Sequence, residues 1–295
     1  MSRIFSITPA PGHRLLTMER VINLGPAGLR PYDIDGDNVD AFLATPPDEV
    51  VSMWGIDPYS SRGFEFDFSA GGYNVRVCTP ASPNDWRIAL DFLAALSRYL
   101  GEPISDEDGS SYSPETITSF PFARDIGAGL TSLRTSVEQG STIQLGGVRR
   151  SVSFTTDMLR RVLDAPSPVD EFGETMRVIQ QLEAYDANQM VARAPKGEIL
   201  GMYTLTESVA TILPLEPRLS ASLRHHIGTD VPVEWTLTLI GIEGPADRAE
   251  SYVRAGEVRY RKALAQLPQH KVRVLDGASM LVDGLDRAEL EALRR

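Results

Sequence analysis

The sequence contains a single cysteine, Cys78, and only three lysines, Lys196, Lys262 and Lys271. One cysteine excludes an intramolecular disulfide and a metal site built from several cysteines. No stretch approaches the roughly 18 consecutive apolar residues that suggest a membrane span, and the N-terminal MSRIFSITPAPGH has no apolar run of signal-peptide length. We therefore expect a cytoplasmic protein that contacts no membrane.

Signatures of phosphate binding and of nucleophilic catalysis are also missing. No GxxxxGK[ST] loop and no GxSxG turn occurs. The segment IGAGLTS, residues 126–132, departs from GxGxxG at its third glycine, which is replaced by Ser132, and no apolar strand precedes it. We expect no cofactor and assign no catalytic residue.

Basic residues are scarce relative to acidic ones. The chain has 29 lysines and arginines against 40 aspartates and glutamates, a formal net charge of −11 at pH 7. A field of this sign repels the phosphate backbone, so nucleic-acid binding is disfavoured. The same field attracts a basic protein surface, although acidic charge also commonly serves solubility.

Two segments rich in aromatic and β-branched residues predict a β-hairpin. GFEFDF, residues 63–68, and YNVRVC, residues 73–78, alternate apolar with polar positions around the turn sequence SAGG. Phe64, Phe66 and Phe68 would then share one face of the hairpin.

The segment SPNDWRIALDFLAALSRYLG predicts the clearest helix. Ser82 is placed as the N-cap, Pro83 at the first helical position and Asp85 three residues after the cap, which is the spacing of a capping box. An apolar stripe that begins at Trp86 follows at helical spacing, and Gly101 supplies the stop. A hairpin followed by such a helix makes an α+β layer.

The length of 295 residues suffices for about two domains at roughly 150 residues each. We expect an α+β fold of two packed lobes, residues 1–140 and residues 141–295, each made of antiparallel strands with covering helices. If the strands beside Gly146 and Gly147 instead join a sheet of the first half, the chain is one continuous domain.

Two other stretches have weaker patterns. ISDEDGSSYS, residues 104–113, is polar almost throughout and predicts a loop. DRAESYVRAGEVRYRKALAQL, residues 247–267, is rich in helix formers and predicts a mostly helical segment.

The acidic stretch YDIDGDNVD resembles the start of an EF-hand calcium loop. Asp33, Asp35 and Asp37 alternate as the first ligands of such a loop do, but its twelfth position, which needs a bidentate Glu, is Ala44. The stretch fits a helix start better, with Asp37 as the cap of NVDAFLA and Asp40 bonding back to it. We predict the helix and no calcium site.

The segment LRHHIGTD contains two of the four histidines, His225 and His226. Metal-binding histidines on a helix are usually four residues apart, whereas adjacent side chains diverge by about 100°. Asp230 has the right spacing from His226, but Gly228 interrupts a helix that would carry both. We expect no zinc site here.

The stretch WGIDPYSSRGFE is the best candidate for a binding surface. It places Trp54, Tyr59, Arg62 and Glu65 on a segment with Gly and Pro just before the hairpin. Aromatic residues and arginine are enriched at recognition surfaces. The alternative is a packed loop with Trp54 in the core, and the residue types alone do not separate the two.

Three parts of the chain together resemble an uncharacterised bacterial family of similar length, described only as a domain of unknown function. They are SRGFEFDF, YNVRVCTPASPNDWRIAL and ILGMYTLTES, with ILPLEP downstream. The resemblance implies a self-contained cytoplasmic protein that is accessory rather than central to metabolism, and it implies no activity or cofactor. Its most specific elements are Arg62-Gly63-Phe64-Glu65, Thr79-Pro80 with Asp85-Trp86, and Tyr203 with Leu205, Thr206 and Glu207.

The leading hypothesis is a soluble, non-enzymatic accessory protein of a regulatory or immunity type that binds another macromolecule through its acidic surface. We expect its partner to be a protein with a basic surface, and its binding residues to be Trp54, Tyr59, Arg62, Glu65 and Glu207. The alternative is an enzyme that acts on a small cationic or carbonyl substrate through Arg62, Glu65 and Glu207. The enzyme hypothesis requires these residues to meet in one concave pocket, together with Asp85 and Tyr203.

Overall fold

The computed structural model describes residues 2–32, 34, 38–48, 50–139, 143–195, 197–228 and 231–294. The chain divides into two compact units, Met1–Gln181 and Leu182–Arg295, which we call unit 1 and unit 2. Both units combine sheets with helices, so the predicted α+β class is confirmed.

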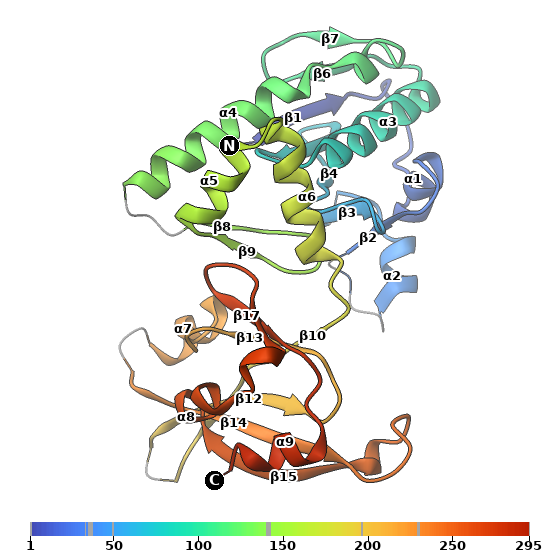
Figure 1. The fold of residues 1–295 in the computed structure, drawn as a ribbon. Helices are drawn as coiled ribbons and strands as arrows, with labels where there is room; N and C mark the ends of the chain where they lie inside the picture. Colours follow the sequence, from blue (N-terminus) through green and yellow to red (C-terminus); the bar gives the residue numbers. More distant parts are fainter. Residues whose placement is uncertain are drawn as a thin grey trace. The chain divides into compact units, whose positions relative to one another are not determined.

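Unit 1 is built on a seven-stranded sheet in which all neighbouring strands are antiparallel (Figure 1). Its strands are β1 (Ser2–Ile7), β2 (Leu29–Pro31), β3 (Ser52–Ile56), β4 (Phe64–Ser69), β5 (Gly72–Cys78), β6 (Ile104–Asp106) and β7 (Ser111–Tyr112). The order is β2-β3-β4-β5-β1-β6-β7, so the N-terminal strand lies between β5 and β6 near the middle of the sheet.

The predicted hairpin is formed by β4 and β5. Ser69 lies opposite Gly72, so that Ala70 and Gly71 alone make the turn. Both adopt positive φ angles, 52° at Ala70 and 80° at Gly71. Positive φ at both central residues is what a two-residue hairpin turn of type I′ needs, because its twist then matches that of the strands.

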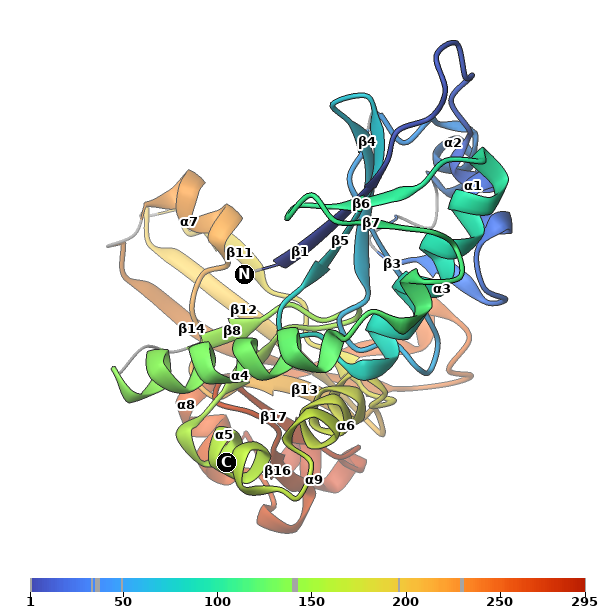
Figure 2. The ribbon, with the colours of Figure 1, turned by 90° about the horizontal axis from the view of Figure 1, so that it is seen from above.

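Helix α3 (Pro83–Leu100) begins as the sequence predicts. The Ser82 hydroxyl accepts a hydrogen bond from the Asp85 backbone N–H, and the Asp85 carboxylate accepts one from the Ser82 backbone N–H. Gly101 ends the helix with a φ of 72°. Helix α1 (Met18–Leu24) packs against α3, and Figures 1 and 2 show both on the same side of the sheet.

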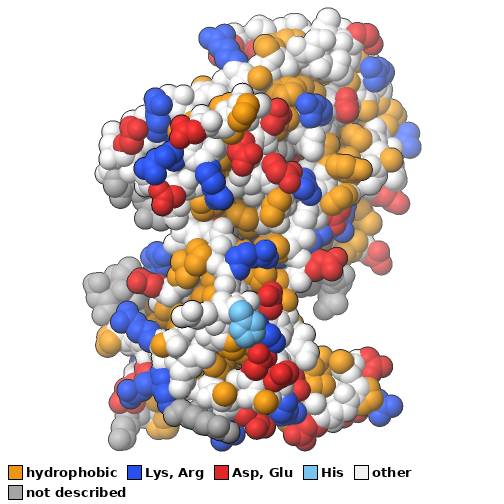
Figure 3. All heavy atoms as spheres, viewed as in Figure 1, with side chains coloured by type: hydrophobic (Ala, Val, Ile, Leu, Met, Phe, Trp, Pro, Cys, Tyr) orange, Lys and Arg blue, Asp and Glu red, His pale blue; other side chains and the backbone are white. Residues whose placement is uncertain are grey.

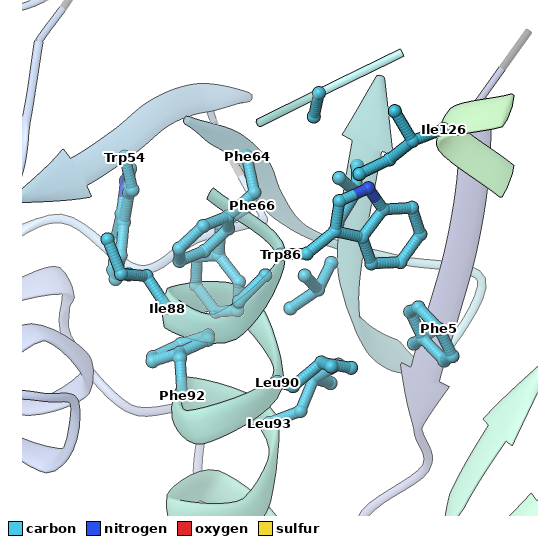
Figure 4. Close-up of a cluster of buried hydrophobic side chains, with 14 of the residues drawn as sticks. Phe5, Trp54, Phe64, Phe66, Trp86, Ile88, Leu90, Phe92, Leu93 and Ile126 are labelled. Carbon is cyan, nitrogen blue, oxygen red and sulfur yellow. The ribbon is translucent and has the colours of Figure 1, made fainter. Parts of the chain in front are cut away.

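The core of unit 1 lies between the sheet and α3, and Figure 4 shows its aromatic centre. The Trp54 ring contacts the rings of Phe64, Phe66 and Phe92, with centroids 4.7 to 6.2 Å apart. Trp86, near the start of α3, is also fully buried. Burying an aromatic side chain of this kind contributes about 1.5–3 kcal/mol to stability, so these rings dominate the packing of the unit.

The residues after 140 complete unit 1 rather than begin a second lobe. They form β8 (Ile143–Leu145), β9 (Val152–Phe154), α5 (Thr156–Asp164) and α6 (Pro168–Gln180), which follow η2 (Ile117–Ser119) and α4 (Phe122–Glu138). Helices α4, α5 and α6 pack on one another, and α6 also packs against α3. Leu159 and Phe172 belong to the same hydrophobic core as the hairpin. A boundary near 140 would cut through that core, and the compact units separate only after Gln181.

Unit 2 contains two four-stranded sheets. The first has the order β11-β12-β14-β15 and is formed by β11 (Met190–Arg193), β12 (Ile199–Thr206), β14 (Val233–Ile242) and β15 (Tyr252–Arg259). The second has the order β10-β13-β17-β16 and is formed by β10 (Tyr185–Asp186), β13 (Thr211–Pro214), β17 (Ser279–Val282) and β16 (Val272–Val274). The helical segments are α7 (Ala221–Ile227), η3 (Ala249–Ser251), α8 (Tyr260–Gln266), η4 (Gln269–Lys271) and α9 (Arg287–Ala292).

Both sheets of unit 2 are mixed. β12 pairs in parallel with β14, and β10 pairs in parallel with β13. Antiparallel strands throughout were predicted, and for unit 2 that prediction is wrong. A parallel pair cannot be joined by a tight hairpin, so the chain returns through β13 and α7 before it enters β14.

Two local predictions are also wrong. Residues 104–113 form β6, β7 and the turn between them, in which Asp106 Oδ1 accepts hydrogen bonds from the N–H groups of Asp108 and Ser110. In the predicted helical segment 247–267, residues 252–259 form a strand, only the three-residue η3 precedes it, and the α-helix begins at Tyr260. Pairing with β14 along this strand overrides a weak local preference for helix.

The acidic stretch before β3 is described in part. Helix α2 (Val39–Ala44) forms as predicted, with Asn38 at the N-cap position, where its side chain makes no capping hydrogen bond. Asp33, Asp35 and Asp37 lie outside the described residues, so a cap by Asp37 stays a prediction. Over the described ranges, no helix combines the length and the apolar character needed to cross a bilayer.

Candidate binding site

One buried carboxylate holds part of the predicted binding stretch against the start of α3. Asp85 is fully buried, and its two oxygens accept hydrogen bonds from the backbone N–H groups of Ser61, Arg62 and Gly63 at 3.0, 3.0 and 2.9 Å. The hydroxyls of Ser61 and Ser82 donate to Oδ2 at 2.8 and 2.7 Å. A buried charge is tolerated only when its acceptor positions are filled in this way. Asp85 therefore fixes the backbone conformation of residues 61–63.

The Arg62 side chain ties the hairpin to two other segments. Its Nη1 donates to the backbone carbonyl of Pro80 at 2.6 Å, and its Nε donates to that of Gly146 at 2.8 Å. Burial lowers the pKa of Arg62, while the neighbouring thiol and carboxyl groups act in the opposite direction. The guanidinium stays charged, because its ordinary pKa lies far above neutral. Two of its N–H groups are thus engaged by the chain's own backbone.

Glu65 projects from the face of the sheet opposite α3, which we call the outer face. It lies directly across from Arg76 on β5, whose Nη1 donates to Glu65 Oε2 at 2.8 Å and whose Nε donates to Ser2 Oγ at 3.0 Å. In the next row Asn74 Nδ2 donates to Asp67 Oδ1 at 3.0 Å. The outer face therefore carries polar side chains that are linked to one another and partly exposed.

Trp54 does not lie at the surface. Its side chain is fully buried, and its Nε1 donates to the buried Ser52 Oγ at 2.5 Å. The alternation along β3 directs Trp54 toward α3, so its assignment as a binding residue is wrong and the packed-core alternative describes it. Tyr59, in the loop that follows β3, is 58% exposed and is available for contact.

The structure gathers a charged cluster that the sequence did not reveal. Asp57 Oδ2 accepts hydrogen bonds from Arg30 Nη2 at 2.7 Å and from Arg149 Nη2 at 2.6 Å. Arg30 also lies over the Tyr32 ring, with its guanidinium carbon 4.8 Å from the ring centroid. Among the described residues the Tyr32 hydroxyl and Asp57 Oδ1 are buried without a hydrogen-bond partner, and burial raises the pKa of Tyr32. The cluster fixes the backbone beside Tyr59.

Glu207 and Tyr203 belong to unit 2 and have partners there. Glu207 Oε2 accepts a hydrogen bond from the Ile242 N–H at 2.9 Å and pairs with Arg287 Nε at 3.0 Å. The Tyr203 hydroxyl accepts a hydrogen bond from Gln189 Nε2 at 2.5 Å, and its ring is almost fully buried. Both residues therefore stabilise the packing of unit 2.

The histidine pair lies in the last turn of α7. The rings of His225 and His226 have centroids 5.6 Å apart and planes at 66°, and Gly228 follows the helix as predicted. Asp230 lies outside the described residues. Within the part of the chain that the structure describes, no group of three or more His, Cys, Asp or Glu side chains could hold a metal ion.

Of the five predicted binding residues, the structure places Tyr59, Arg62 and Glu65 in the same part of unit 1, around the loop between β3 and β4 and the strand that follows it. Arg62 and Glu65 are engaged by neighbouring groups, and Tyr59 projects into solvent. An ordered polar surface with one exposed aromatic side chain suits recognition of a macromolecule through hydrogen bonds and ion pairs.

The chain belongs to a family described as a domain of unknown function, DUF4299, whose profile matches residues 2–293. This match confirms the resemblance inferred from the sequence and extends it over nearly the whole chain. Searches of the curated proteins and of the solved structures gave no match.

Proposed function

We propose that this member of the DUF4299 family is a non-enzymatic binding protein whose partner is a protein with a basic surface. One observation carries the proposal: residues 31–61 contain seven acidic residues and no lysine or arginine, and although Asp57 is paired with Arg30 and Arg149, the six others leave the segment strongly acidic. A segment of one charge sign attracts an oppositely charged surface and accelerates its encounter with the chain.

Acidic charge is unevenly distributed between the two units. Unit 1 contains 24 acidic and 15 basic residues, whereas unit 2 contains 16 and 14. On the face shown in Figure 3, acidic and basic side chains are interspersed rather than gathered into one field. We therefore assign the contact to the acidic segment 31–61 of unit 1 rather than to the net charge of the whole chain.

Exposed apolar side chains accompany these acids. Val39, Val50 and Val51 are 38%, 37% and 58% exposed. Asp40 and Asp48, in the same segment, are exposed and form no ion pair with any residue that the structure describes. Protein interfaces combine apolar anchors with a charged rim, so we expect the valines to govern dissociation and the carboxylates to govern association.

The enzyme alternative finds less support in the positions of its three residues. Arg62 is engaged by two backbone carbonyls, Glu65 by Arg76, and Glu207 by Arg287 within unit 2. A catalytic acid or base must reach a substrate proton at hydrogen-bond distance. Each of the three would first have to give up the contact that it makes.

The proposal is tested by the kinetics of the complex. The chain is used to capture its partner from the source cell, mass spectrometry identifies that partner, and association is measured with both proteins purified. The association rate should fall markedly between about 20 and 300 mM salt, because the Debye length shrinks over that range. A salt-independent association rate would contradict the electrostatic contact.

A pair of matched variants locates the contact. Asp40→Asn/Asp48→Asn should lower the association rate about two- to fivefold at low salt and leave dissociation nearly unchanged. Asp247→Asn/Glu250→Gln removes the same charge from exposed positions of unit 2 and should leave both rates unchanged. Equal losses in the two variants would show that only net charge matters and would overturn the role of residues 31–61.

A further inference from the structure

Unit 2 contains a cavity of about 420 Å³. Its walls are residues 233–235 at the start of β14, residues 259–261 where β15 passes into α8, and residues 216–217 after β13. The volume lies within the roughly 300–1,000 Å³ that small-molecule sites occupy in proteins. All of the lining residues belong to unit 2, so the cavity is a property of that unit alone.

One wall of the cavity is a firmly held indole. The Trp235 ring stacks on the Tyr203 ring, with centroids 5.5 Å apart and an angle of 25° between the planes. It also lies over Gly201 on the neighbouring strand β12, where any side chain would overlap the ring. Tyr260, the adjoining wall, is buried, and its hydroxyl donates to the Pro214 carbonyl at 2.6 Å. Trp235 therefore presents a flat apolar surface that is partly exposed and preorganised for stacking.

Two side chains of opposite charge at the cavity rim, Arg261 and Glu216, are available to a ligand. Arg259 and Glu234 form an exposed ion pair, with Nε and Oε1 3.5 Å apart. Arg261 and Glu216 also line the cavity, are exposed, and form no ion pair within the described part of the chain. A ligand with only a carboxylate or phosphate would meet the repulsion of the glutamates. A ligand with only an ammonium group would meet that of the arginines.

We propose that this cavity binds a small zwitterion with a flat apolar side chain, the chemical class of an aromatic α-amino acid. Its carboxylate pairs with Arg261, its ammonium group pairs with Glu216, and its ring stacks on Trp235. A guanidinium can hold a carboxylate through two hydrogen bonds, which fixes the orientation of the ligand. The site uses none of residues 31–61, so it stands or fails independently of the protein–protein contact proposed above.

The protein carries its own fluorescent reporter for this site. Trp54 and Trp86 are fully buried in unit 1, whereas Trp235 is the partly exposed tryptophan that lines the cavity. With excitation at a wavelength that only tryptophan absorbs, addition of L-phenylalanine should change the protein fluorescence, and the change should saturate as the ligand concentration rises. Calorimetry on the same solutions should report the same dissociation constant. A fluorescence and heat signal that does not saturate would overturn the proposal.

Ligand analogues test each contact separately. Phenylacetate lacks the ammonium group, phenethylamine lacks the carboxylate and L-alanine lacks the ring, so each should bind at least about tenfold more weakly than L-phenylalanine. Arg261→Gln should weaken phenylalanine and phenylacetate about tenfold, whereas phenethylamine should bind as well or more tightly because a repelling cation is removed. Glu216→Gln should weaken phenylalanine and phenethylamine about tenfold, whereas phenylacetate should bind as well or more tightly because a repelling carboxylate is removed.

A matched control separates a site effect from a change of net charge. Arg273→Gln removes an exposed arginine of unit 2 outside the cavity and should leave the affinity for phenylalanine unchanged. Thermal melts of the three variants should superimpose on that of the wild type. Two results would overturn the proposal. One is an equal affinity for phenylalanine in the wild type, Arg261→Gln and Glu216→Gln. The other is that the wild type binds phenylacetate or phenethylamine as tightly as it binds phenylalanine.

Discussion

Asp85 and Ser61 are joined by two hydrogen bonds across the interior of unit 1. The Ser61 backbone N–H donates to Asp85 Oδ1 at 3.0 Å, and the Ser61 hydroxyl donates to Oδ2 at 2.8 Å. The same carboxylate also completes the capping box of α3. One side chain thus fixes both the start of the main helix and the loop that leads into the hairpin, and the two elements should lose stability together if it is changed.

Asp85→Asn should lower the free energy of unfolding by about 3 kcal/mol or more. The amide nitrogen would face N–H groups that now donate to a carboxylate oxygen, and at least one buried donor would lose its acceptor. Urea denaturation measures the loss. Asp91→Asn, at an exposed position of the same helix, is the control and should change stability by less than about 0.5 kcal/mol.

Gly63→Ala should be far more damaging than Gly71→Ala, although both glycines have positive φ angles, 65° and 80°. A methyl group at Gly63 would overlap the Trp54 backbone carbonyl, whereas at Gly71 it would meet open space. We expect a loss of at least about 3 kcal/mol for Gly63→Ala and about 1 kcal/mol for Gly71→Ala, from the left-handed backbone alone. Similar denaturation midpoints for the two variants would contradict this difference.

Local sequence patterns correctly predicted the elements that are determined by residues close together in the chain. The capping box of α3 needs only Ser82 and Asp85, and the β4–β5 turn needs only Ala70 and Gly71, so both are correctly predicted. The strand at 252–259 was mistaken for a helix because its arginines, alanine and glutamate favour helix locally. Its state is decided by β14, a separate segment, and no local pattern records that pairing.

The candidate site was only partly predictable for the same reason. Arg30 and Arg149 reach Asp57 from positions 27 and 92 residues away, and neither stands in a motif. The composition of the 54–65 stretch indicated an ordered surface segment, but it could not show on which side of β3 the Trp54 ring lies. Alternation along Ser52–Ile56 was the available signal, since Ser52 and Trp54 both face the core.

Trp54→Phe should destabilise unit 1 more than Trp86→Phe, although both indoles are fully buried. The Trp54 Nε1 donates to Ser52 Oγ, whereas the Trp86 Nε1 has no partner among the described residues. Removing the bonded donor leaves a buried hydroxyl without its partner, which should add about 1 kcal/mol to the loss. Chemical denaturation of the two single variants checks the order, and equal losses would mean that Trp86 Nε1 is bonded in solution.

The ion pair between Lys271 and Glu289 should make the stability of unit 2 depend on pH in the acidic range. Lys271 Nζ lies 2.6 Å from Glu289 Oε2 and also donates to the Gly284 carbonyl at 2.9 Å. The hydrogen bond to Lys271 lowers the pKa of Glu289 from its ordinary value of 4.5. Because the folded-state pKa is the lower one, the stabilisation is present in full above the unfolded-state pKa and is lost as the pH falls through the folded-state pKa.

Glu289→Gln should therefore unfold at lower denaturant than the wild type at pH 7, and the gap should narrow steadily as the pH falls below about 4.5. Glutamine can still accept the capping hydrogen bond from the Asp286 N–H, so the change reports mainly on the charge. Glu291→Gln, at an exposed position of the same helix, should shift the midpoint little at either pH. A gap of constant size from pH 7 to pH 3 would show that the stabilisation does not depend on the charge of Glu289, and would contradict the role given to the ion pair.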